Sequence, residues 1–462
     1  MKQSKPVNLG EGSVGKLIFK LSLPTITAQL INALYNMVDR VYIGHIPEIG
    51  ETALTGVGVC MSLIMIVSAF ASLTAMGGAT RASILLGRGE KKQAEQVLGN
   101  CTTGVIAVSL FLTALLLLLN RPMLLSFGAS PDTIGYATQY MNLYACGTIF
   151  VSISLGLNAF ITAQGFTTVS MLSVLLGAVT NIVLDPILIF ACHMGVRGAA
   201  LATVISQAIS AAWVLRFLLG KKTTLRIQKE NLPIRWRLYA PCLALGLSPF
   251  VMQSTEGVIS ICFNSSLQRF GGDMAVGAMT VLATVMQMAM LPLQGLTQGT
   301  QPLVSYNYGA GNAERVKKAF FLLLRASLLY SFVLWVLAMG VPQIFAKIFM
   351  TDGTLIAYTA WAMRIYMAAT LVFGAQIACQ QTFIALGNAK TSLFLAVLRK
   401  IILLIPLIFL LPAFFSSMEQ KVMAVFLAEP VADAIAVATT VITFTLSFRK
   451  VLRQMKEQKH EI

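Results

Sequence analysis

The chain has 462 residues, 56% of them hydrophobic and only 11% charged, and its mean hydropathy is +0.77. Soluble globular domains carry about 25% charged residues, so this composition excludes a soluble fold and predicts an all-α polytopic membrane protein. The net charge of +16 does not predict nucleic-acid binding, because the basic residues follow the membrane topology that the apolar segments define.

Twelve apolar segments are each long enough to cross a bilayer, which takes about 20 helical residues. Lys and Arg gather at alternate ends of these segments, so the positive-inside rule places both termini in the cytoplasm. The same residues favour contact with anionic lipid. The predicted spans lie near 17–43, 51–76, 96–119, 133–163, 167–191, 196–219, 238–268, 273–303, 316–342, 355–386, 390–414 and 419–447.

A repeat divides the chain into two halves. Leu21-Ser-Leu-Pro24 opens the first segment as Gly246-Leu-Ser-Pro249 opens the seventh, and Gly87-Arg-Gly89 ends the second as Gly309-Ala-Gly311 ends the eighth. Because six is even, both halves enter the membrane from the same side, which predicts parallel, pseudo-symmetric repeats of a kind typical of transporters. We expect an N-terminal six-helix lobe (1–220), a basic cytoplasmic linker (221–237), a C-terminal six-helix lobe (238–448) and a cytoplasmic tail (449–462).

Asn181 and Asp185 stand inside the fifth apolar segment, directly before Pro186. Residues four apart on a helix share one face, and the proline frees a backbone carbonyl that needs another partner. An ionisable residue at membrane depth is costly and by default marks an ion or proton pathway. The alternative is a structural Asn–Asp pair that holds two helices together.

Asp39 ends the first segment, after about 33 Å of helix, and so lies in the outer half of the membrane, at a depth that Asp185 shares. Two neighbouring carboxylates in a low-dielectric interior favour one proton or cation between them. Thr203 on the sixth segment can complete an oxygen site for Na+ with Asp39, Asn181 and Asp185. The alternative for Asp39 is a partly solvated helix end paired with Arg40.

The C-terminal half carries its own charged residues within apolar segments. Glu256 lies in the seventh, Arg399 and Lys400 in the eleventh, and Glu429 and Asp433 one turn apart in the twelfth. Two interpretations stay open: a static buried bridge from Arg399 to Glu429 or Asp433, or a role in cation binding or gating.

Methionine and glutamine side chains are the candidates for a drug-binding cleft, because methionine adapts to many ligand shapes, although a methionine stripe is also ordinary packing. No P-loop, HExxH or GxSxG motif occurs, and the seven cysteines show no metal-type spacing, so neither an enzyme nor a bound cofactor is predicted. The cleft candidates beside Glu256 and Asp433 are Met286, Gln287, Met288, Met290, Gln294, Gln376, Gln380 and Gln381.

Three segments together resemble motifs of the multidrug and toxic compound extrusion (MATE) family, and its MepA-like branch above all. They are Tyr35-Asn-Met-Val-Asp39-Arg-Val-Tyr-Ile-Gly44, Asn181-Ile-Val-Leu-Asp185-Pro186-Ile-Leu-Ile-Phe190 and Gly195-Val-Arg-Gly-Ala-Ala200. The resemblance covers essentially the whole chain. It implies the MATE fold, with twelve helices in two bundles that rock to give alternating access.

The resemblance also implies residue roles. A cation site of the DinF-like type matches Asp39, Asn181, Asp185 and Thr203, with Tyr140 and Asn158 as further polar positions. Pro24 resembles a proline about which the first helix bends. Glu256 resembles an acid of the NorM-like branch, but the acid which that branch carries in helix ten is missing here, which favours the N-terminal lobe as the coupling site.

The implied function is a secondary active antiporter in a bacterial cytoplasmic membrane, a monomer that exports cationic and amphipathic compounds in exchange for Na+ or H+. The alternative within transport is a flippase for lipid-linked precursors, which would need a strongly cationic cleft. A channel or a sensor that does not transport is the alternative outside it. The sequence does not distinguish Na+ from H+, because both favour the same acids.

Overall fold

The computed structural model describes residues 7–349 and 351–460, without the side chains of 458–460, and the described residues contain helices and turns but no strand. This confirms the all-α expectation. In lipid every backbone N–H and C=O needs a partner, and a helix supplies these partners within a single segment.

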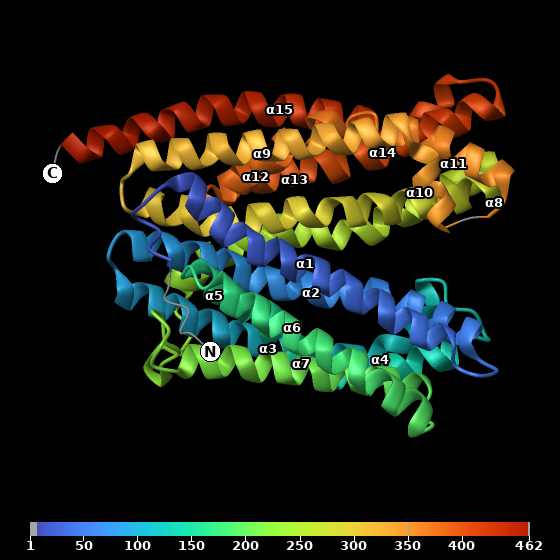
Figure 1. Cartoon of the computed structure of the whole chain (residues 1–462), viewed down its shortest axis with the longest axis horizontal. Coiled ribbons are helices and arrows are strands. Elements are labelled where there is room, and N and C mark those ends of the chain that lie inside the picture. The colour runs from blue at the N-terminus through green and yellow to red at the C-terminus, as the bar shows by residue number, and fades with distance from the viewer. Residues whose placement is uncertain (1–6, 350, 461–462) are drawn as a thin grey trace.

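The N-terminal half forms one bundle, blue to green in Figure 1. The linker that follows it contains a single short 3-10 turn, η3 (Lys229–Asn231). The helices of this bundle are α1 (Val14–Gly44), α2 (Gly50–Gly87), α3 (Lys91–Ser126), α4 (Ile134–Ser152), η1 (Ile153–Leu157), α5 (Asn158–Ala163), α6 (Thr167–Pro186), η2 (Ile187–Ala191) and α7 (Val196–Leu219).

The C-terminal half forms a second bundle, yellow to red in Figure 1, which lies side by side with the first. Its helices are α8 (Trp236–Gly309), α9 (Ala313–Gly340), α10 (Pro342–Phe349), α11 (Gly353–Tyr366), α12 (Thr370–Ala385), α13 (Ala389–Val397), η4 (Leu398–Leu404), α14 (Ile405–Leu410), η5 (Leu411–Phe414) and α15 (Met418–His460).

The described helices account for the twelve predicted spans. Ten helices are long and apolar enough to cross a membrane, and α11 with α12 makes an eleventh span. The long helix α8 counts twice, because Gly272 interrupts it with φ 63° and ψ −160°, a conformation that only glycine adopts readily. The seventh and eighth spans therefore meet at this residue.

One predicted span differs in shape from a single helix. The segment expected at 355–386 consists of α11 and α12, which are bent by 49° relative to each other. The break frees backbone carbonyls, and the indole Nε1 of Trp335 donates to one of them, Ala368 O, at 3.0 Å. A side chain on the neighbouring helix thus satisfies a polar group that a straight helix would satisfy itself.

The two bundles meet most closely where α2 packs against α8. A Cβ atom at Gly87 would collide with the carbonyl oxygen of Tyr306, and one at Gly309 would collide with the carbonyl oxygen of Ile84. Glycine therefore lets the two backbones touch. These are the glycines that the sequence repeat places in equivalent positions, so the contact is reciprocal.

Hydrogen bonds on both sides of Pro24 join α1 to the second bundle. Ser22 Oγ donates to Leu296 O at 3.1 Å, and Thr25 Oγ1 donates to Gly295 O at 2.6 Å. Helix α1 continues through the proline. The bend at Pro24 stays a prediction, and the structure places that residue between two contacts that cross the bundle interface.

Candidate functional site

Two acids from different helices of the N-terminal bundle come together in its interior. Asp39 near the end of α1 is 5% exposed, and Asp185 near the end of α6 is fully buried. Their side chains lie within hydrogen-bonding reach of each other. Two carboxylates at this separation in a low-dielectric interior repel unless a proton or a cation lies between them.

Asn181 completes the polar centre of this site. It is fully buried, and its Nδ2 donates to Asp185 Oδ1 at 3.3 Å, one helical turn away. Three buried oxygens then lack a hydrogen-bond partner among the described residues: Asp39 Oδ1, Asn181 Oδ1 and Asp185 Oδ2. Unpaired buried oxygens are costly, and a small cation or a proton satisfies several of them at once.

The local sequence explains why α6 presents these groups inward. Asn181 and Asp185 occupy one face four residues apart, and Pro186 cannot continue the hydrogen-bond ladder. The chain continues as the π-helical segment η2 directly after that proline. Such wide turns are frequent at functional sites, because they alter the orientation of the side chains next to them.

Tyr140 of α4 and Thr203 of α7 form the wall next to the acids. Tyr140 is 2% exposed, lies close to Asp39, and its hydroxyl is within hydrogen-bonding reach of Thr203. Thr203 is itself buried. Four helices of one bundle therefore contribute side chains to the site, namely α1, α4, α6 and α7.

Two further residues were missed in the sequence analysis. The Tyr35 side chain lies near both acids, within hydrogen-bonding reach of Gln207. Gln207 Oε1 in turn accepts from Ser154 Oγ at 2.5 Å. Spacing alone could have found them, since Tyr35 precedes Asp39 by four residues and Gln207 follows Thr203 by four.

Asn158 lies apart from this cluster. Its Nδ2 donates to Ser170 O at 3.3 Å, near the beginning of α6. Fifteen residues separate Ser170 from Asp185, which corresponds to about 22 Å of helix. No hydrogen bond joins Asn158 to either acid within the described ranges, so the structure does not bring this residue to the site.

The structural alternatives for the acids have little geometric support. Arg40 forms no ion pair with Asp39 in the part of the chain that the structure describes, and its own side chain is exposed. The bond between Asn181 and Asp185 lies within α6 and does not join two helices. A pair of this kind stabilises one helix, and it does not account for the buried carboxylate of Asp39 next to it.

The charged residues that the sequence places inside apolar segments of the C-terminal half are already paired. Arg399 Nε bonds to Asp433 Oδ1 at 2.6 Å, and an Arg399 Nη2 contact to Glu429 Oε1 measures 3.1 Å. Lys400 Nζ lies 2.7 Å from Glu256 Oε1. The buried bridge that the sequence left open is therefore present, and both Glu429 and Asp433 of α15 belong to it.

The proposed cleft residues divide into two groups. Gln287 and Gln294 are exposed, seven residues apart on one face of α8, and the Glu256 side chain is 51% exposed. Met290 packs in the core of the C-terminal bundle. Gln376 and Gln380 are buried and bond to each other at 3.3 Å, so none of these three faces open space.

The comparisons with known proteins extend over nearly the whole chain. The sequence model of the MatE family matches residues 24–187 and 250–410. The chain is 24% identical over 437 residues to the multidrug export protein MepA of Staphylococcus haemolyticus (strain JCSC1435), with 95% of each protein covered. It is also 24% identical over 419 residues to MepA of Staphylococcus aureus (strain NCTC 8325 / PS 47), with 90% of this chain and 91% of the relative covered.

Two solved structures share the fold. The MATE multidrug transporter DinF-BH is 33% identical, with a TM-score of 0.89, and the match covers 98% of this chain and 99% of that one. The outward-facing conformation of a multidrug resistance MATE family transporter of the MOP superfamily is 20% identical, with a TM-score of 0.89 and the same coverage. At that lower identity the second match shows the fold alone.

Proposed function

The chain belongs to the MatE family and is a multidrug efflux transporter, not an enzyme, and we propose that it exports cationic and amphipathic compounds in exchange for Na+ or H+. The observation that carries this proposal is the buried pair of acids, Asp39 and Asp185, with three oxygens of the site unpaired within the described residues. A fixed structural pair would leave none of them unsatisfied.

The coupling ion binds between these two acids, with Asn181 supplying a neutral oxygen and Thr203 a hydroxyl. We infer that the drug binds between the two bundles, at the exposed side chains of Glu256, Gln287 and Gln294. If ion binding and drug binding favour different arrangements of the bundles, each drives the release of the other through differential affinity.

Alternating access is supported by where α1 touches the second bundle. The hydrogen bonds that this helix makes to α8 among the described residues lie at or before Gln29, whose Nε2 donates to Gln298 Oε1 at 2.9 Å. Asp39 lies ten residues beyond, or about 15 Å of helix. We infer that the structure is closed on the side of the basic turns, the cytoplasmic side of a bacterial membrane.

A flippase for lipid-linked precursors is the weaker proposal. It would need free cationic groups in the cleft to bind a pyrophosphate. Arg399 and Lys400 are the basic residues placed for that role, and both are paired with acids. A transporter of organic cations agrees better with this charge distribution.

The decisive experiment measures uphill efflux of ethidium from proteoliposomes under an imposed sodium gradient, and separately under an imposed pH gradient. We expect one gradient to drive accumulation of the dye against its concentration. Transport that only equilibrates the dye under both gradients would contradict the antiport proposal and indicate a channel.

A further inference from the structure

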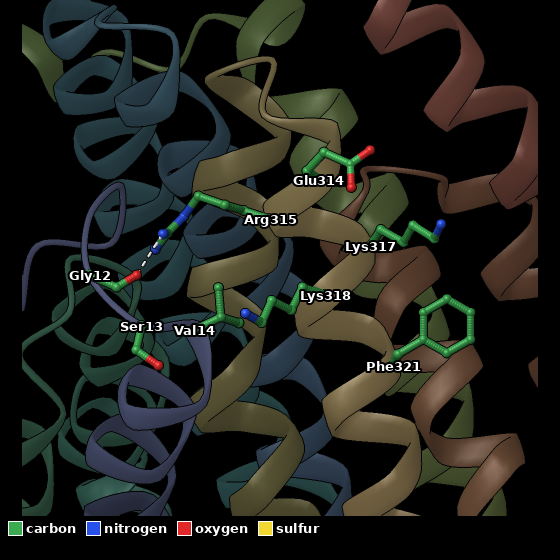
Figure 2. A pocket seen from close by; sticks show the side chains of 8 residues that line it. All are labelled: Gly12, Ser13, Val14, Glu314, Arg315, Lys317, Lys318 and Phe321. Atoms are coloured by element: carbon green, nitrogen blue, oxygen red, sulfur yellow. Dashed lines mark hydrogen bonds between the residues drawn. The ribbon is translucent and has the colours of Figure 1, made fainter.

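We propose that the cavity between the first turns of α1 and α9 binds the phosphate headgroup of an anionic phospholipid. The cavity measures about 400 Å³ and is formed by the starts of both helices. Figure 2 shows Arg315 and Lys318 extending toward α1, while Lys317 and Phe321 point to the opposite side of the helix. The residues around it are Gly12, Ser13, Val14, Glu314, Arg315, Lys317, Lys318 and Phe321.

The charge of this cavity is positive and uncompensated. Its one acid, Glu314, is paired with Lys456 of α15 at 3.0 Å. Lys317 and Lys318 are exposed and form no ion pair within residues 7–349 and 351–457. A phosphate placed here would meet Lys318, which extends toward α1 and pairs with no described acid, while Lys317 lies on the other side of α9 near Glu314.

Arg315 adds a third positive charge and also builds the wall. Its guanidinium donates to the carbonyl oxygens of Leu9, Glu11 and Gly12, at 3.2, 3.2 and 2.7 Å. Its Nε donates to Asn307 Oδ1 at 2.9 Å. All four acceptors are neutral, so the arginine keeps its charge while it holds the segment 7–13, which we call the strap, against the C-terminal bundle.

The start of α1 offers backbone donors in the same place. Ser13 precedes the helix but makes no capping hydrogen bond, and no acid occupies the first turn. The first N–H groups of a helix have no partner within it, and they favour an anion. This feature is common to many helices, but here it borders a cavity that Arg315, Lys317 and Lys318 line.

A run of exposed lysines usually lies on a solvated helix face and binds nothing. Exposed apolar side chains nearby favour a lipid over free phosphate as the ligand of this cavity. Phe321 follows Lys317 and Lys318 by about one turn and is 44% exposed, and Phe19 on α1 is 68% exposed. Leu322 touches the space beside Gly15, so α1 and α9 pack directly against each other below the cavity. A free phosphate needs no such surface, whereas an acyl chain would cover the exposed ring of Phe321, which lines the cavity.

A bound lipid would connect the strap to the rest of the molecule. The strap touches the N-terminal bundle where a Cβ at Gly165 would lie 2.9 Å from Val7 O. It touches the C-terminal bundle through Asn307, whose Nδ2 donates to Leu9 O at 2.9 Å. The strap therefore spans both bundles, and an anionic lipid would stabilise the arrangement in which they are closed on this side.

The test uses the full-length protein in a neutral detergent and follows its thermal unfolding. Dihexanoyl phosphatidylglycerol is titrated in, with dihexanoyl phosphatidylcholine and inorganic phosphate in parallel. We expect phosphatidylglycerol alone to raise the Tm saturably, by about 2 °C or more. The double variant Lys317→Gln/Lys318→Gln should need a phosphatidylglycerol concentration about 30-fold higher for the same rise in Tm, because each lysine contributes a factor of about five to the affinity.

The repeat supplies a matched control in Lys91 and Lys92, exposed lysines in the first turn of α3, the helix that corresponds to α9 in the other half. The variant Lys91→Gln/Lys92→Gln should respond like the unmodified protein, and Lys317→Arg/Lys318→Arg should keep the response because it keeps the charge. An equal loss in both glutamine variants would overturn the site, as would an equal effect of phosphatidylcholine. An equal effect of inorganic phosphate would overturn the assignment to lipid.

Discussion

The side chains of Asp39 on α1 and Asp185 on α6 are both buried in one bundle and lie within hydrogen-bonding reach of each other. The hydrogen bonds of α1 to the second bundle lie nearer the N-terminal end of the helix, where Ser22 and Thr25 bond to α8. Helix α1 thus contacts both the ion site and the partner bundle, so ion binding can act through this helix on the arrangement of the two bundles.

The first prediction concerns these two acids. Asp39→Asn and Asp185→Asn should each reduce ion-driven efflux at least about tenfold, because each removes a charged oxygen from the site. The folded protein should remain in the membrane. The measurement is dye efflux from proteoliposomes at matched protein content. Asp132→Asn, on an exposed turn between α3 and α4, is the control, and full coupled transport by both site variants would end the assignment.

The second prediction concerns Tyr35, which spacing would have found but the motifs did not single out. Tyr35→Phe removes the hydroxyl that reaches Gln207 beside the acids. Removing one neutral hydrogen bond costs about 1 kcal/mol, so the ion concentration for half-maximal transport should rise roughly fivefold with the maximal rate retained. A change confined to the maximal rate would place Tyr35 outside the ion site.

The sequence predicted the parts of the site that lie within one helix. Asn181 and Asp185 are fixed by a spacing of four, and their burial follows from the apolar segment around them. The contact between Asp39 and Asp185 could be inferred only as equal depth, because which faces of α1 and α6 meet depends on the packing of the whole bundle.

In the C-terminal bundle, too, the sequence did not show which side chains of different helices meet. The sequence placed Arg399, Glu429 and Asp433 inside apolar segments but left a buried bridge and a cation site as equal alternatives. The distances decide that the guanidinium is paired with both acids. Gln376 and Met290 are suited to a cleft by residue type, yet both are buried. Residue type could not predict this, because it does not show which face of a helix points into the bundle.

The third prediction tests the importance of that pairing. Arg399→Gln leaves Glu429 and Asp433 as buried acids without their partner, and we expect the free energy of unfolding to fall by about 3–5 kcal/mol. Adding Glu429→Gln and Asp433→Asn should restore much of the loss, because no uncompensated charge then remains. Arg453→Gln, which breaks the exposed pair with Glu457, should change stability by less than about 1 kcal/mol.

The fourth prediction concerns the closed interface between the bundles. At Gly309 of α8 an added methyl group would collide with the carbonyl oxygen of Ile84 in α2. Because this oxygen belongs to the helix backbone, it can move aside only if α2 and α8 separate. Gly309→Ala should therefore open the molecule on the cytoplasmic side and reduce efflux several-fold. Spin labels introduced by Arg88→Cys and Ala310→Cys into a cysteine-free background, on the turns that follow these helices, should report a longer distance.

Gly257 provides the control for this experiment, because it lies in the same helix α8 with nothing within 4 Å of an added Cβ. Gly257→Ala should leave both the distance between the labels and the efflux unchanged, which separates the effect of the contact from that of replacing a helical glycine. If Gly309→Ala keeps the short distance while efflux falls, the contact of α2 with α8 is not what closes this side, and the lobes must be held by the hydrogen bonds of Ser22, Thr25 and Gln29.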